Sequence, residues 1–279
     1  MKIYFANDCR AYHGGSWAVS EVIRSEIVAA GHSLLVESDP ARIEIDAISE
    51  ADAIIVNGEG TLHHNKSRPR HLLDILAEGQ RRGKWTALIN TSWQDMSTDH
   101  DDVLRRLDHF TVRETLSLRE LDQKHGVTAT LLPDLSLQYP ITIPDLPKDD
   151  RTLITDLYAA EFGCFVILNG GSRSKLPLLD MRKLNWSDTL ATVKRHPVFV
   201  TGRFHGMMAA LRARTPFVAF GGNTHKIAGV MHWAGQPQLC CDTPSALFTA
   251  AGKVKRLGEL YEKLFDWAAQ LPKWRLPAL

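Results

Sequence analysis

The sequence is poor in cysteine and has no long apolar segment, and both absences narrow the class of protein. Its 279 residues include four cysteines, which show neither a CxxC spacing nor a ladder of pairs, so we expect reduced thiols rather than disulfides. No apolar run is long enough for a membrane-spanning helix, and the apolar part of the opening segment MKIYFAND is too short for a signal peptide. We therefore expect a soluble, cytoplasmic protein.

The chain also has little net charge and lacks repeated sequence segments. The formal net charge is +1, and no dense run of Lys and Arg is interleaved with aromatic residues, which argues against a nucleic-acid partner. We find no internal repeat and no low-complexity segment. The hydrophobic content of 44% supports a real core, and the length suits one large domain or two ordinary ones.

Short apolar runs, each followed by a helix or a polar loop, predict an α/β fold with parallel sheets. The first half contains predicted strands at residues 2–6, 33–37, 51–56, 85–90, 110–112 and 129–132, and predicted helices at 17–30, 70–82, 101–107 and 117–124. The second half contains predicted strands at 165–168, 198–200, 217–220 and 238–241, and predicted helices at 187–194, 207–214, 244–251 and 257–271. Ser16 is the predicted N-cap of the first helix.

One segment reads as a linker. Residues 138–151, QYPITIPDLPKDDR, combine prolines with an acidic cluster and have no helical period. The chain is thereby divided into an N-terminal domain, residues 1–140, and a C-terminal domain, residues 150–279. We expect two Rossmann-like domains that face a central cleft, an architecture similar to that of the GT-B glycosyltransferases.

The stretch 198–231, VFVTGRFHGMMAALRARTPFVAFGGNTHKIAGVM, is predicted to form a strand, a turn, a helix and a second strand. Arg203, His205, His225 and Lys226 would then lie at the carboxyl ends of adjacent strands, where ligands bind in open α/β sheets. Four side chains that can carry positive charge indicate an anionic ligand.

A glycine-rich loop follows the predicted strand at residues 51–56. Gly58 and Gly60 let the backbone pass close to a ligand or to the neighbouring domain. Glu59, between them, places a carboxylate at the end of the strand, unless it is an exposed loop acid. His63 and His64 lack further ligands at metal-binding spacing, so we expect no bound metal.

Four motifs in order resemble the polysaccharide pyruvyl transferase family: ADAIIVNGEGTL, DHFTVRETLSL, LPDLSL and VTGRFHGMMAALRARTPFVAFGGNTHKIAGVM. The resemblance spans residues 50–232 and implies a GT-B-like fold. It also implies transfer of a pyruvyl group from phosphoenolpyruvate to two hydroxyls of a sugar as a ketal, and we expect no cofactor. The sequence departs from the family pattern at Glu59, where we expect a further glycine, and in the compactness of its second half.

The chemistry of that donor suggests roles for individual residues. Arg203 and Arg113, one from each half, are candidates to bind phosphate and carboxylate across the cleft, because a guanidinium can bind either group with two hydrogen bonds. For Arg113 the alternative is a salt bridge to Glu114 or Asp134. The remaining predicted substrate-binding positions are Asn57, Gly58, Gly60, Gly206, His225 and Lys226, with a solvated surface position as the alternative for Lys226.

Ketal formation also needs proton transfer. His205 is the candidate acid or base because an imidazole changes charge near neutral pH. Glu59 and Asp134 are the candidate bases for the acceptor hydroxyls.

We place the acceptor on the N-terminal domain and the donor on the C-terminal domain. Loops 7–16, 63–70 and 91–101 are expected to set the acceptor, with Trp17 and Trp93 available to stack on a sugar, although packing is the alternative role for Trp17. A lipid-linked acceptor would bring peripheral membrane contact. Two other functions stay open: a GT-B glycosyltransferase that uses a nucleotide sugar, with the GGSR loop at 170–173, and a non-catalytic glycan-binding relative.

Overall fold

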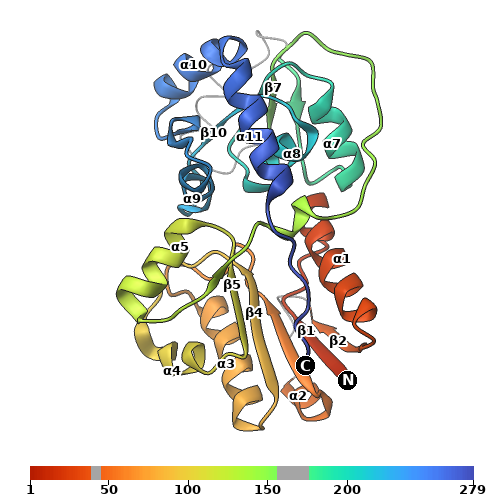
Figure 1. The fold of residues 1–279 in the computed structure, drawn as a ribbon, viewed down its shortest axis with the longest axis vertical. Helices are drawn as coiled ribbons and strands as arrows, with labels where there is room; N and C mark the ends of the chain where they lie inside the picture. The colour runs from red at the N-terminus through yellow and green to blue at the C-terminus, as the bar shows by residue number, and fades with distance from the viewer. Residues whose placement is uncertain (39–44, 156–175) are drawn as a thin grey trace. The chain divides into compact units, whose positions relative to one another are not determined.

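The computed structural model describes residues 1–38, 45–155 and 176–279. The strand predicted at 165–168 and the GGSR loop lie outside the described residues. The chain forms two compact units (Figure 1). Unit 1 comprises Met1–Cys9, Val19–Leu135 and Pro272–Leu279, and unit 2 comprises Arg10–Ala18 and Ser136–Leu271. The predicted linker at 138–151 therefore falls within unit 2.

The described part of unit 1 is built on a six-stranded parallel sheet in the order β2-β1-β3-β4-β5-β6. The strands are β1 (Lys2–Ala6), β2 (Ser33–Ser38), β3 (Ala53–Asn57), β4 (Trp85–Thr91), β5 (His109–Val112) and β6 (Thr130–Leu131). The helices are α1 (Gly14–Ala29), whose first turn belongs to unit 2, α2 (Ile45–Glu50), α3 (Ser67–Arg81), α4 (Asp101–Arg105) and α5 (Thr115–Glu120). All five residues of β3 are buried, which explains why this strand is apolar without alternation.

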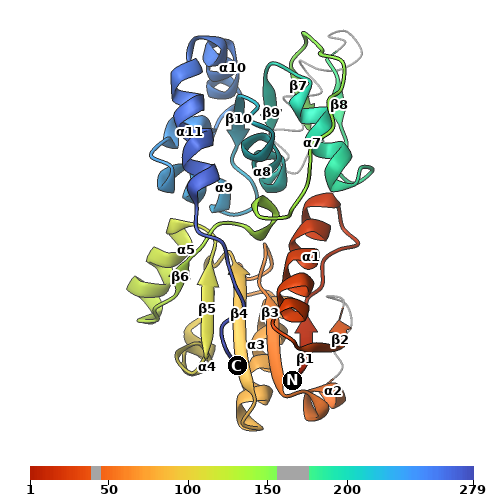
Figure 2. The ribbon, with the colours of Figure 1, turned by 45° about the vertical axis from the view of Figure 1, so that its right-hand side comes forward.

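Unit 1 also includes a segment distant in sequence. Trp274 is 1% exposed, and its indole Nε1 donates a hydrogen bond to Nε2 of His109 at 3.1 Å. Figure 1 and Figure 2 show both chain termini in this unit. From residues 272–279, Trp274 is therefore the side chain that is buried in unit 1.

The described part of unit 2 contains a five-stranded parallel sheet in the order β11-β10-β9-β7-β8. The strands are β7 (Leu153–Thr155), β8 (Leu178–Leu179), β9 (Phe199–Thr201), β10 (Phe217–Phe220) and β11 (Cys240–Cys241). The helices are α7 (Trp186–Lys194), α8 (Phe204–Ala213), α9 (Lys226–Trp233), α10 (Pro244–Lys253) and α11 (Gly258–Gln270). α11 buries one face, which includes Tyr261, Leu264 and Phe265.

The predicted fold class is confirmed: both units are α/β with parallel sheets. The predicted N-cap is wrong, because α1 begins at Gly14 and Ser16 lies inside the helix. Four further elements, α2, β7, β8 and α9, were not predicted from the sequence. Among the described residues, no helix combines the length and apolar character needed to cross a membrane.

Candidate functional site

In unit 2 the strand order reverses between β7 and β9, because β8 lies beyond β7 on one side and β10 beyond β9 on the other. Ligands bind at such a point, outside the carboxyl ends of the strands. β9 ends at Thr201, Arg203 is the N-cap of α8, and His205 lies in the first turn of that helix. The sequence analysis placed both side chains at a strand end, and the structure puts that end at the switch point of the sheet.

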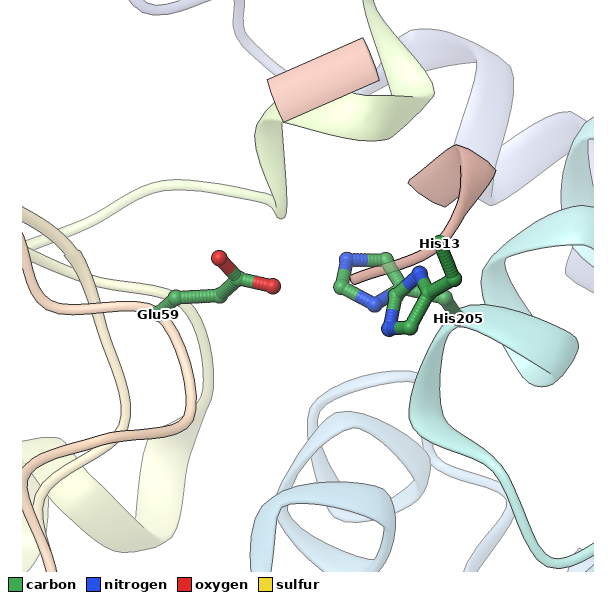
Figure 3. A group of neighbouring side chains, drawn as sticks. All are labelled: His13, Glu59 and His205. Carbon is green, nitrogen blue, oxygen red and sulfur yellow. The ribbon is translucent and has the colours of Figure 1, made fainter. Parts of the chain in front are cut away.

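His205 is 5% exposed and is surrounded by aromatic rings. Its imidazole lies 5.5 Å from the ring of Phe204, 6.5 Å from that of Trp186 and 4.8 Å from the imidazole of His13, centroid to centroid. Figure 3 shows His13 and His205 side by side, His13 from the loop before α1 and His205 from α8. The sequence analysis missed His13, although it directly precedes the Gly14-Gly15 pair.

Gly15 and Gly206 allow close packing around His205. A Cβ at Gly15 would lie 2.5 Å from Cγ of His205, and a Cβ at Gly206 would lie 2.2 Å from Oγ1 of Thr201. That hydroxyl accepts a hydrogen bond from the backbone N–H of Arg203 at 3.0 Å. The glycine at 206, which we predicted as a substrate contact, is thus required for packing of α8 against β9, and its substrate contact stays a prediction.

His225 and Lys226 begin α9, which follows the loop after β10. Nζ of Lys226 donates a hydrogen bond to Oδ1 of Asn223 at 2.7 Å, and both side chains are half-buried. Lys226 is therefore held by the loop rather than extended into solvent. Its predicted contact with phosphate, like that of His225, remains a prediction.

The sheet of unit 1 reverses its order between β1 and β3. Asn7 follows β1 and Asn57 ends β3. The Asn7 amide donates to the Asn57 carbonyl at 2.6 Å, and the Asn57 amide donates to a Glu59 carboxylate oxygen at 3.3 Å. Arg68 donates to Oδ1 of Asn7 at 3.2 Å. Four polar side chains thus meet at this switch point. Of these, Asn7 and Arg68 were predicted only as members of the acceptor loops 7–16 and 63–70, and not as individual site residues.

Glu59 has an unusual backbone conformation. Its φ is +39°, in the left-handed region that glycine adopts most readily, and the residue is 7% exposed. The alternative of an exposed loop acid is therefore wrong. Burial raises the pKa of the Cys9 thiol well above its usual value, and the Glu59 carboxylate raises it further, so this thiol stays protonated beside the carboxylate.

The glycines on either side of Glu59 differ in their surroundings. A Cβ at Gly58 would lie 2.1 Å from Oγ1 of Thr91 on β4, whereas Gly60 is half-buried. Gly58 is therefore required for close packing on β4. Its predicted substrate contact and that of Gly60 are still predictions.

Arg113 forms the ion pair that the sequence analysis left open. Its guanidinium donates to Asp134 at 2.7 Å and to the hydroxyl of Ser92 at 2.9 Å, and the two charged side chains are 1% and 0% exposed. Glu114 instead caps α5, accepting from the backbone N–H groups of Leu116 and Ser117. The roles predicted for Arg113 and Asp134 toward ligands are not tested by these contacts.

A polar cavity of about 560 Å³ lies in unit 1 where α3 begins. It is lined by Ser67, Arg68, Arg70, His71, Asp74, Asp99 and His100. These residues come from α3 and from the loop between β4 and α4, two regions that include parts of the predicted acceptor loops. Trp93 does not contribute to a sugar-stacking surface, because it is 0% exposed and its Nε1 donates to Nε2 of His125 at 3.1 Å.

The sequence profile of the family described as polysaccharide pyruvyl transferase matches residues 4–224. The chain belongs to the polysaccharide pyruvyl transferase family. No curated protein matches the sequence.

Solved structures share its fold at low sequence identity. A putative UDP-N-acetylglucosamine 2-epimerase from Listeria monocytogenes has a TM-score of 0.58 at 10% identity, covering 95% of this chain and 90% of its own. A mutant O-GlcNAc transferase from Thermobaculum terrenum has a TM-score of 0.56 at 13% identity, with 97% and 64% covered. S. aureus MnaA with UDP has a TM-score of 0.55 at 10% identity, with 95% and 90% covered. These likenesses confirm the GT-B-like fold of this family member.

Proposed function

We propose that this protein transfers a pyruvyl group from phosphoenolpyruvate to two hydroxyls of one sugar in a glycan, releasing phosphate and forming a ketal. Membership of the pyruvyl transferase family supports the transferase class. The observation that carries the proposal is the turn from Arg203 to Gly206 at the switch point of the unit 2 sheet. It combines a guanidinium for the donor anion with an imidazole for proton transfer.

In the proposed reaction, the methylene carbon of phosphoenolpyruvate takes a proton from His205, so that C2 becomes electrophilic. One sugar hydroxyl adds to C2 and gives up its proton. The bond from C2 to the phosphate oxygen breaks, and the second hydroxyl adds to C2 and gives up its own proton. Of the two protons released, one restores His205 and the other leaves on phosphate.

Arg203 binds the carboxylate or phosphate of the donor, and the first turn of α8 favours an anion at the same place. Glu59 takes one hydroxyl proton and passes it to the departing phosphate; its carboxylate lies at the switch point of unit 1. Asp134 is the weaker candidate base because its carboxylate already accepts from Arg113.

The test is incubation with phosphoenolpyruvate and a broad glycan panel. We expect phosphate release together with the mass gain of one pyruvyl ketal on an acceptor. His205→Ala should lower kcat by roughly a hundredfold or more, and Arg203→Ala should mainly raise KM for phosphoenolpyruvate. Arg212→Ala, at the other end of α8, is the matched control and should leave both constants unchanged. No mass gain with any acceptor refutes the proposal.

A nucleotide-sugar transferase is the rival function, because the structurally similar S. aureus MnaA is bound to UDP. Thermal-shift measurements separate the two. Stabilisation by phosphoenolpyruvate and not by UDP supports the pyruvyl transferase, and the reverse result supports the rival. Normal function of a folded double variant, Arg203→Ala with His205→Ala, would instead favour a non-catalytic glycan-binding protein.

We further propose that the polar cavity at the start of α3 holds a sugar of the acceptor glycan. Its volume lies within the range of small-ligand sites. Its Arg and Asp side chains offer both donors and acceptors to hydroxyl groups. Replacement of two lining residues, Arg70→Gln with Asp99→Asn, should raise KM for the acceptor severalfold and leave KM for phosphoenolpyruvate unchanged. An unchanged acceptor KM contradicts this placement.

A further inference from the structure

His13 occupies a position that belongs to none of the motifs on which the family resemblance rests. It directly precedes α1, in the part of the chain that folds with unit 2. Its ring is half-buried and lies edge-on to that of His205, with an interplanar angle of 62°. The neighbouring imidazole is the proposed proton donor, so His13 lies beside the reacting centre of the proposed function.

The hydrogen bonds of His13 favour one tautomer of its ring. The backbone N–H of Ser16 donates to Nδ1 of His13 at 3.2 Å, and the N–H of Trp17 donates to its carbonyl oxygen at 3.0 Å. His13 is therefore the side-chain cap of α1 that the sequence analysis assigned to Ser16. A nitrogen that accepts a hydrogen bond carries no proton, so this contact favours the tautomer of the neutral ring whose proton is on Nε2. Nε2 also lies 3.4 Å from the hydroxyl of Ser16.

The surrounding backbone is built for this approach of the two rings. Besides the Gly15 contact with His205, a Cβ at Gly14 would lie 2.5 Å from the backbone nitrogen of Trp186 at the start of α7. A side chain at either glycine would push the start of α1 away from α7 and α8. The Gly14-Gly15 pair therefore holds His13 beside His205.

We infer that His13 helps to bind the pyruvyl donor. Its Nε2–H would donate a hydrogen bond to the phosphate or carboxylate of the anion bound by Arg203. A neutral imidazole capped at a helix N-terminus is suited to hydrogen-bond an oxygen that gains negative charge, because it donates without losing its proton. His13 and His205 then divide the work: His13 binds the oxygen and His205 supplies the proton. The inference rests on the proposed function for the identity of the donor, but the anion contact itself can be measured without transfer activity.

The variant His13→Asn distinguishes anion binding by His13 from its role as the cap of α1. The Asn side chain is a preferred N-cap and can still accept from the Ser16 N–H, but its shorter amide cannot replace the imidazole. His13→Asn should therefore keep the thermal stability of the wild type, whereas His13→Ala should lower it. Both variants should weaken the binding of phosphoenolpyruvate, and of inorganic phosphate as a simple probe, by roughly tenfold or more in calorimetry, the worth of one charge-assisted hydrogen bond.

The outcomes distinguish this inference from the proposed function. If wild type binds phosphate and His13→Asn binds it more weakly, the inference stands even where no pyruvyl transfer is found, and only the proposed function fails. Equal affinity of wild type and His13→Asn, or no binding of either probe by wild type, overturns the inference. Long-range ¹H–¹⁵N NMR spectra of the imidazoles give a second check, because a proton on Nδ1 of His13 also overturns it.

Discussion

Glu59 offers a prediction in which stability and activity move separately. The residue adopts a φ of +39° although it has a side chain, and this conformation costs a residue with a Cβ about 1–2 kcal/mol. Glycine avoids that cost, whereas elsewhere glycine is less stable than alanine by about 0.5–1 kcal/mol. At position 59 the usual order should therefore be reversed, with Glu59→Gly more stable than Glu59→Ala.

The magnitude follows from the contacts of the side chain. Both variants lose the hydrogen bond from Asn57, worth about 0.5–1.5 kcal/mol. Glu59→Ala keeps the backbone strain, so we expect it to be about 1 kcal/mol less stable than wild type. Glu59→Gly recovers roughly that amount through its relaxed backbone and should be close to wild type.

Hydrogen exchange is the assay of choice for stability, since β1 and β3 peptides report on unit 1 without the assumption that both units unfold together. Transfer activity is measured in parallel by phosphate release. Glu59→Gly and the isosteric Glu59→Gln should both lose roughly a hundredfold in kcat if the carboxylate is the hydroxyl base. Faster exchange in Glu59→Gly than in Glu59→Ala refutes the conformational argument, and a normal rate for Glu59→Gln refutes the catalytic one.

Three further predictions concern packing and burial. Arg113→Gln should destabilise unit 1 by about 3–5 kcal/mol, because it leaves a buried carboxylate without its charged partner; urea denaturation that matches wild type would contradict this. Gly206→Ala should lower the free energy of unfolding by about 1–3 kcal/mol, because its Cβ would clash with the hydroxyl of Thr201. Gly252→Ala, whose Cβ would meet no neighbouring atom within 4 Å, should raise it by up to about 1 kcal/mol. Equal melting temperatures of the two variants would argue against both expectations. Burial, and to a lesser extent the nearby Asp242, raises the pKa of the Cys240 thiol to about 12, so this thiol is uncharged at about pH 8. Iodoacetamide should therefore label Cys240 slowly in the native state and rapidly in urea. Equal labelling rates in the two states would contradict the protection of Cys240.

The sequence was most informative where structure depends on neighbouring residues. The buried strand β3 could be predicted because its residues are apolar up to Asn57. The turn that carries Arg203 and His205 could also be predicted, because one strand and the helix directly after it determine both positions. β8 has two residues and is too short to leave a periodic pattern.

Contacts between segments that are distant in the sequence could not be predicted. Nothing near His13 in the sequence indicates that its ring meets His205, since that contact depends on where α1 begins relative to α8. The capping error at Ser16 is local instead, because the rule that favours serine at N-caps does not anticipate an imidazole three residues earlier in that position. The role of Asn7 depends likewise on the pairing of β1 with β3.

The assignment of residues 272–279 to unit 1 has a consequence for synthesis. A ribosome that has completed residue 135 has made every strand of the unit 1 sheet, yet Trp274 is still missing from its core. At about 5–20 residues per second, that indole arrives roughly 7–30 seconds later. During this interval the nascent unit exposes the apolar surface that Trp274 later covers, and a chaperone that shields this surface would have its greatest effect before residue 274 has been made.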